Sequence, residues 1–330
     1  MKIYITIQFF LLMILSAIPD ATNAQTCSCA GAPLLSSQST GAGGKGNLLV
    51  GFTYEYNQIT NLFSGSNQLT NDSAERNTQS GLLEISYGLT ERLSISGTLS
   101  TVRKQRISGL TIPGGTQTSV TSGVGDGIFM MRYTIKQQDL WNRYHLAVGL
   151  GGKAPIGSTS VRNDNNLLFN ADMQPGSGAW DLVLWNQTGI SLMPLSTLNI
   201  TWINSFRYTG KNERFTETDF YQFGNEWISN LTATNSFPFS DRLSYGISVR
   251  YRSTSSDQRN DAQMPNTGGK WVSIIPDLFV GISDRATFKI SGQIPVYQYL
   301  NGTQPTTKYA ISGAFFINFN SSTNTFIHGN

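Results

Sequence analysis

Residues 309–319, with the sequence YAISGAFFINF, decide the fold of this chain of 330 residues. Large apolar side chains alternate there with small or polar ones. The large ones are Tyr309, Ile311, Phe315, Ile317 and Phe319, and between them lie Ala310, Ser312, Ala314 and Asn318. Because successive side chains of a β-strand point to opposite faces, this period of two predicts a strand with one apolar face.

The same alternation recurs from residue 47 onward in short segments, which are separated by loops rich in Gly, Asn, Ser and Asp. We predict twelve strands, at residues 47–58, 79–88, 92–102, 122–135, 143–154, 178–191, 197–208, 218–233, 242–253, 271–282, 286–298 and 306–319. Asn204 and Asn225 depart from the pattern. Segments of about ten residues with this alternation are typical of transmembrane β-barrels.

The predicted connections differ in length. Those after even-numbered segments are short, and several after odd-numbered segments are long, as at residues 59–78, 103–121, 155–177 and 254–270. Outer-membrane barrels combine short periplasmic turns with long outer loops. The pattern therefore predicts an all-β fold: a transmembrane antiparallel up-and-down barrel of about 12 strands at residues 47–319, with a C-terminal tail at residues 320–330.

The composition agrees with a barrel. Charged residues make up 13% of the chain, compared with about 25% in soluble domains. The mean hydropathy of −0.19 is too low for a helical membrane protein. A net charge of +3 gives no reason to expect a nucleic-acid partner.

The N-terminus has the layout of a secretory signal peptide. Met1 and Lys2 precede an apolar run at residues 3–18, and small residues precede a cleavage site between Ala24 and Gln25. The alternative is a single membrane anchor. We expect the signal peptide at residues 1–24 to direct export and to be cleaved, and the mature chain to reside in the outer membrane of a Gram-negative bacterium. The expected partners are the lipid bilayer, a small-molecule solute and the outer-membrane barrel assembly machinery.

Charged residues fall on the polar phase of the predicted strands, with six acids and six bases in balance once Glu55 and Lys308 are included. A charge facing lipid at mid-bilayer costs about 2–4 kcal/mol, so we expect these side chains to face the lumen. The lumen-lining candidates are Glu84, Asp126, Arg132, Lys153, Asp181, Arg207, Glu226, Arg250, Asp277 and Lys289.

Two cysteines, Cys27 and Cys29, lie in residues 25–46, which we expect to be a flexible periplasmic segment. An oxidising compartment favours a disulfide between them. A soft-metal site or a redox pair is the alternative.

Enzymatic activity is not expected. The outer-membrane phospholipases and lipid A deacylases place a catalytic His close to a Ser, but His145 is followed by Leu146 and Ala147. The sequence contains no nucleotide loop that opens a helix and no zinc-helix motif. We predict no cofactor.

Residues 88–93 (GLTERL), 125–127 (GDG), 131–133 (MRY) and 149–157 (GLGGKAPIG) together carry a family resemblance. They resemble the outer-membrane proteins called MetA-pathway phenol-degradation-like, which are transporter-type barrels similar in outline to long-chain fatty acid channels. The start at residues 27–33 (CSCAGAP) resembles a Bacteroidetes-type subgroup. The resemblance implies passage of small hydrophobic or aromatic compounds across the outer membrane.

The sequence therefore predicts a channel or transporter for passive passage of small molecules, hydrophobic or aromatic ones among them. Two alternatives stay open. One is a closed structural or surface-display barrel without transport. The other is a barrel that anchors a periplasmic metal or redox site at Cys27 and Cys29.

Overall fold

A computed structural model of the chain describes residues 25–26, 43–71, 74–110, 115–138, 142–192, 197–216 and 218–319. Over these ranges the chain is almost entirely strand and loop, with one helical turn, η1 (Ala171–Met173). None of the described residues forms a helix that is long and apolar enough to span a membrane.

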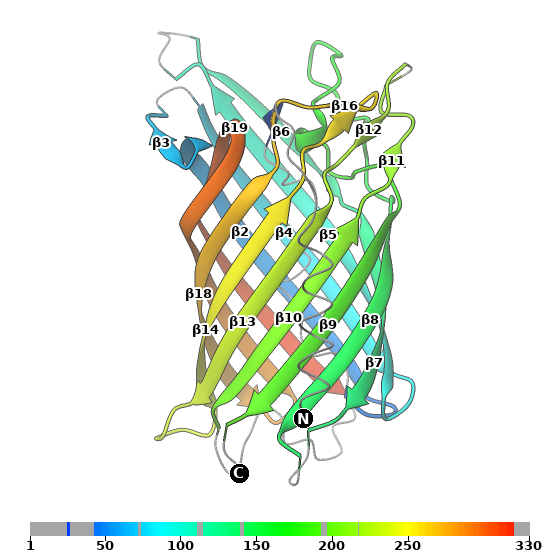
Figure 1. Cartoon of the computed structure of the whole chain (residues 1–330), viewed down its shortest axis with the longest axis vertical. Coiled ribbons are helices and arrows are strands. Elements are labelled where there is room, and N and C mark those ends of the chain that lie inside the picture. The colour runs from blue at the N-terminus through cyan, green and yellow to red at the C-terminus, as the bar shows by residue number, and fades with distance from the viewer. Residues whose placement is uncertain are drawn as a thin grey trace.

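Eleven elements make up a single closed wall (Figure 1). They are β2 (Leu48–Gly65), β4 (Ala74–Gly88), β5 (Leu93–Ser108), β7 (Gly127–Lys136), β8 (Tyr144–Ala154), β9 (Asp181–Ser191), β10 (Asn199–Tyr208), β13 (Glu226–Ser236), β14 (Leu243–Thr254), β18 (Gly269–Ser283) and β19 (Ala286–Phe319). Neighbours along this order pair antiparallel, and β19 closes the ring on β2.

The last element, β19, crosses the wall twice. Its 34 residues would extend about 110 Å if they ran in one direction. Instead, its first half pairs with β18 and its second half pairs with β2. The amide of Asn318 donates to the carbonyl of Arg285 at 2.8 Å, which brings the two halves side by side. The described chain therefore makes twelve crossings, and the prediction of an antiparallel barrel of about 12 strands is confirmed.

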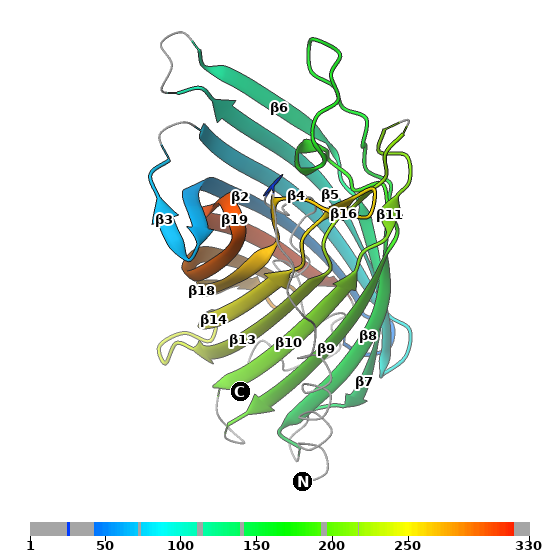
Figure 2. The same cartoon turned by 45° about the horizontal axis from the view of Figure 1, so that its top comes forward.

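The short turns lie together at one end of the barrel, at the bottom of Figure 1. The two ends of the wall also meet there, because Leu48 pairs with both Phe319 and Tyr87. At the opposite end, β2, β4 and β5 continue beyond the predicted segments. Much of the predicted loops 59–78 and 103–121 is therefore strand. Figure 2 shows β5 and β6 (Gln117–Val124) standing out at this end.

Two predicted segments differ from the structure. The segment at 122–135 is divided between β6 and β7 at Gly125 and Asp126, where the amide of Gly125 still donates to the carbonyl of Ser100 at 2.8 Å. The segment at 218–233 begins at Glu226 instead, because Asn225 turns its side chain to the amide of Thr209, with an N–O distance of 2.9 Å.

Large apolar side chains on the outward phase of the strands are exposed, as expected for a wall that faces lipid. Examples are Leu83 and Ile85 on β4, Phe129 on β7, and Leu182 and Leu184 on β9. On the opposite phase, the charged and polar side chains are buried inside the barrel. This sorting is what the sequence pattern predicted, except at Lys308, which is exposed where the pairing of β19 with β2 is irregular.

Several short elements lie at the long-loop end of the barrel (Figures 1 and 2). They are β3 (Asn67–Leu69), β11 (Lys211–Asn212), β12 (Tyr221–Gln222), β15 (Gln258–Arg259), β16 (Ala262–Gln263) and β17 (Asn266–Thr267). The strand β1 (Gln25–Thr26) pairs in parallel with β17. This pairing puts Gln25 and Thr26 at the long-loop end. The expectation of a flexible periplasmic segment at residues 25–46 stays a prediction.

The remaining terminal predictions lie outside the described residues. They concern the signal peptide at 1–24, the cysteine pair Cys27 and Cys29, and the tail at 320–330. The proposals of a disulfide, a metal site or a redox pair at Cys27 and Cys29 stay predictions.

Candidate functional site

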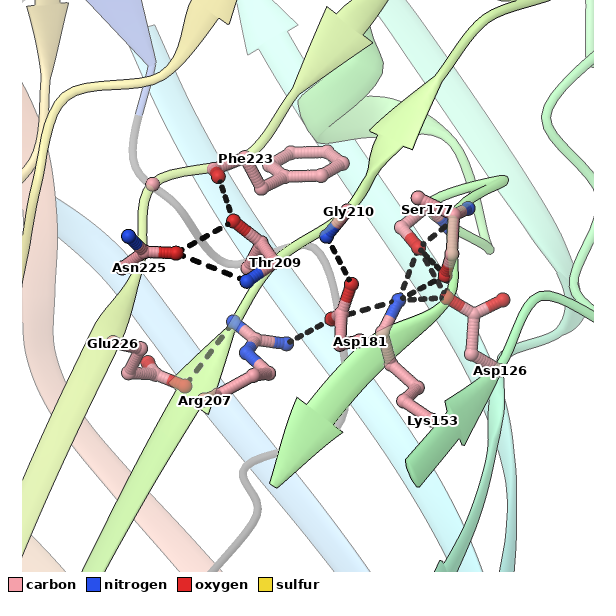
Figure 3. Close-up of polar contacts among 12 residues, drawn as sticks. Asp126, Lys153, Ser177, Asp181, Arg207, Thr209, Gly210, Phe223, Asn225 and Glu226 are labelled. Carbon is pink, nitrogen blue, oxygen red and sulfur yellow. Dashed lines mark hydrogen bonds and ion pairs between the residues drawn. The ribbon is translucent and has the colours of Figure 1, made fainter. Parts of the chain in front are cut away.

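Six charged side chains on neighbouring strands form one continuous row of ion pairs inside the barrel, and Figure 3 shows the first five of them. We call this row the charge ladder; it consists of Asp126, Lys153, Asp181, Arg207, Glu226 and Arg252. The nitrogen–oxygen distances along it are 2.7, 3.1, 3.8, 3.1 and 2.6 Å. It links the start of β7 with β8, β9, β10, β13 and β14.

The strand register explains why these side chains meet. Lys153 lies directly opposite Asp181, and Arg207 lies directly opposite Glu226. Between these two pairs, Arg207 faces Val183, so Asp181 is offset by two residues and approaches the long arginine side chain diagonally. Each contact therefore joins adjacent strands, and the ladder runs along the wall rather than across the lumen.

Burial makes the pairing necessary. The first five side chains of the ladder are at most 6% exposed. An unpaired charge at such a position costs several kcal/mol, and removing one partner of a buried pair is strongly destabilising. Three acids and three bases leave the ladder without net charge.

Backbone amides hold two of the carboxylates. Asp126 Oδ2 accepts hydrogen bonds from the amide of Ser177 at 2.9 Å and from its hydroxyl at 2.6 Å. Asp181 Oδ1 accepts from the amide of Gly210 at 3.1 Å. The ladder is thus tied to the two loops that follow β8 and β10.

The loop at residues 155–180 folds against the inner wall. Lys104 Nζ on β5 donates to the carbonyl oxygens of Asp172 and Gln174 at 2.8 and 2.7 Å. Arg76 on β4 forms an ion pair of 2.9 Å with the Asp172 carboxylate. Gly176 allows close packing, because a Cβ there would lie 2.5 Å from the backbone of Gly157.

Little space remains beside the ladder. Leu82, Thr98, Ser100 and Ile128 enclose a void of about 10 Å³ together with three ladder residues, Asp126, Lys153 and Arg207. This volume is close to the least that holds one water molecule. The barrel is therefore closely packed around this void.

An apolar layer adjoins the ladder on the same strands. Met130, Ala147, Val183 and Trp185 form a buried cluster, against which Ile128 and Ile203 pack. Ile228 on β13 contacts the same two isoleucines. The inner wall thus combines a charged row with an apolar surface.

The predicted lumen residues take different positions. Five of them, Asp126, Lys153, Asp181, Arg207 and Glu226, come together in the ladder. Asp277 and Lys289 form a separate pair at 3.1 Å. Arg250 donates to Gln293 at 3.0 Å.

Glu84 is buried outside the ladder. Arg132 is also buried outside it, and its guanidinium lies over the Trp185 ring, 5.1 Å from the ring centroid.

Three charged residues of the site were not among the predicted ones. Lys104 and Arg76 fell in stretches expected to be loops, and Arg252 stands on the inward phase two residues beyond Arg250. The alternation does predict an inward position for Arg252, because Arg252 lies two residues from Arg250 and therefore on the same face of the strand.

No family model matches the chain, and no curated protein matches it in sequence. The crystal structure of an outer membrane channel from Pseudomonas putida F1 is similar, with a TM-score of 0.65 and 12% identity over 92% of this chain and 100% of that one.

The CymD monoaromatic hydrocarbon channel has a TM-score of 0.42 and 9% identity, over 85% of this chain and 90% of that one. A TM-score below 0.5 adds nothing to the assignment of the fold. The closed antiparallel wall, its exposed apolar outer phase and the similarity in fold to the Pseudomonas structure agree: the chain is an outer-membrane β-barrel.

Proposed function

We propose that the chain is a passive outer-membrane channel for small molecules, hydrophobic or aromatic compounds among them. The observation that carries this proposal is that polar atoms inside the barrel lack hydrogen-bond partners within the protein. Several are buried without a hydrogen-bond partner, including Gln187 Oε1, Ser205 Oγ and Asn230 Oδ1. Buried polar atoms are normally satisfied by protein or water, so an inner wall with several open positions suits a lumen that holds water or solute.

The direction of the ion pairs supports the same proposal. Charges that close a barrel would pair across it, whereas the ladder contacts join neighbouring strands. A neutral ladder beside an apolar layer favours uncharged or amphipathic solutes over a strongly ion-selective conductance.

A closed structural barrel is the second candidate. Two observations favour it: the pairing of the whole ladder and the void of only about 10 Å³ beside it. Under this hypothesis the long outer loops carry the function. The two candidates differ in whether solute passes through the purified protein.

Liposome swelling separates the two candidates. The protein purified from outer membranes is reconstituted, and swelling is followed in small uncharged sugars. The channel predicts solute entry with the wild type and faster entry with Lys104→Met, because this variant loses the bonds that hold residues 155–180 against the wall. Arg103→Met is the matched control, since Arg103 lies next to Lys104 but is exposed. Absence of entry for both the wild type and Lys104→Met would establish the closed barrel.

A further inference from the structure

Arg132 is the charged residue of the inner wall whose hydrogen-bonding capacity is least used. It is 6% exposed. Its Nε and Nη1 atoms are both buried without a hydrogen-bond partner. Arg207 and Arg252, by contrast, form ion pairs in the charge ladder. The buried Glu84 carboxylate is the opposite charge that acts on this guanidinium. Because guanidinium carries five N–H donors, the two open donors can still bind an acceptor from outside the protein.

The neighbouring residues hold this guanidinium in place. Arg132, Gly149 and Trp185 lie side by side on β7, β8 and β9. A Cβ on Gly149 would lie 3.2 Å from the Trp185 ring and 3.3 Å from the Arg132 side chain. The glycine therefore leaves room for the arginine to cross toward the indole, over which its guanidinium lies at 5.1 Å.

Apolar side chains surround this pair. Trp185 belongs to the buried cluster with Met130, Ala147 and Val183, and Ile128 and Ile203 pack on it. A ligand at Arg132 would thus meet charged donors at one end and an indole with aliphatic side chains at the other. A ligand that fits these surroundings has an anionic group attached to an apolar body.

We propose that Arg132 and Trp185 form a binding site for small amphipathic carboxylates, in particular aromatic carboxylates. A carboxylate matches the planar fork of guanidinium and can accept two parallel N–H bonds. An aromatic ring beside it contacts Trp185 and the aliphatic cluster. This site rests on the proposed channel function and names a solute class for it.

Binding is tested on the wild-type protein in lipid nanodiscs by calorimetric titration at pH 7 with three probes. Benzoate has the ring and the carboxylate, benzamide has the ring without the charge, and acetate has the carboxylate without the ring. The site predicts saturable binding of benzoate, and binding of each of the other two at least tenfold weaker. Equal affinity for acetate and benzoate would overturn the apolar half of the site.

Arg132→Met keeps an apolar stem beside Trp185 and removes the donors. It should weaken benzoate binding at least tenfold, which is the effect of losing a charge-assisted pair. Arg132→Lys keeps the charge without the fork and should weaken binding by several-fold, and it guards against a folding defect in the methionine variant. Arg103→Met changes an exposed arginine and should leave benzoate affinity unchanged. Unchanged benzoate affinity in both Arg132 variants would overturn the proposal.

Sugar entry into liposomes, measured in parallel, separates this proposal from the channel itself. Sugar entry without saturable benzoate binding overturns the Arg132 site alone. Benzoate binding that depends on Arg132, without any sugar entry, overturns the channel and leaves the binding site.

Discussion

Arg207 on β10 and Glu226 on β13 occupy opposite positions in the strand register, and their side chains meet 3.1 Å apart inside the barrel. This pair is representative of the ladder, since its contacts join adjacent strands. Sideways pairing neutralises the charges of the ladder without a bridge across the lumen. A barrel can in this way bury a row of charges along its wall while solute still passes through the lumen beside that row.

The first prediction concerns the loop at residues 155–180. Lys104→Met removes two charge-assisted hydrogen bonds to the carbonyls of Asp172 and Gln174. Bonds to charged groups contribute about 1.5–3 kcal/mol each, so the loop should detach more often. Limited proteolysis of intact cells should cut within residues 155–180 several-fold faster than in the wild type. An unchanged cleavage rate would show that the remaining contacts, such as Arg76 with Asp172, suffice.

The second prediction concerns two polar side chains on the lipid-facing phase. Asn204 donates to Asn186 at 3.1 Å from the adjacent strand. Asn204→Leu leaves Asn186 without this partner and should destabilise the barrel, whereas replacing both by leucine should recover the loss. Interhelical bonds in membranes couple by about 0.6 kcal/mol and up to about 1.7 kcal/mol, and a similar coupling is expected here. Urea unfolding in lipid vesicles over the double-mutant cycle measures it, and additive effects of the two changes would refute the pairing.

The third prediction concerns Asp257, in the outer loop between β14 and β15. Its carboxylate is fully buried and accepts hydrogen bonds from the Tyr221 hydroxyl at 2.6 Å and from the amide of Gly224 at 2.8 Å. Burial, the largest cause, and the charge of Asp172 raise the pKa of Asp257 to about 6, against the opposing effect of those bonds and of Arg207.

A raised folded-state pKa fixes the sign of the pH dependence. The stabilisation from protonated Asp257 is fully present below the unfolded pKa of 3.8 and is lost as the pH rises through about 6. The change amounts to about 3 kcal/mol. Hydrogen exchange at residues 220–226, corrected for the intrinsic rate, should therefore be slower at pH 5 than at pH 7. Asp257→Asn should abolish this difference; a difference that persists in the variant would assign it to another group.

The sequence predicted the wall well because its alternation reports which face of each strand meets lipid. The inward positions of Lys153, Asp181 and Arg207 followed from that phase alone. Their mutual contacts did not, because a contact depends on the register between strands. The offset of two residues between Asp181 and Val183, for example, decides that Arg207 reaches both Asp181 and Glu226.

The positions of the loops were harder to predict. Lys104 belongs to a strand that continues past the membrane, and nothing in its local sequence indicates that it binds carbonyls some 70 residues away. The alternation predicts Asn225 within a strand, but its side chain accepts a hydrogen bond from the amide of Thr209, directly after β10. Such contacts depend on tertiary structure, which the period of two does not report.

Reversal potentials in planar bilayers test most directly whether the charge ladder lines an open route. Lys153→Met leaves Asp126 and Asp181 without their shared cation, and Glu226→Gln removes an acid from between two arginines. In a potassium chloride gradient, we expect a nearly unselective wild-type current, a shift toward cation selectivity in Lys153→Met and a shift toward anion selectivity in Glu226→Gln. No current through the wild type, or identical reversal potentials in all three proteins, would contradict a passage along the ladder.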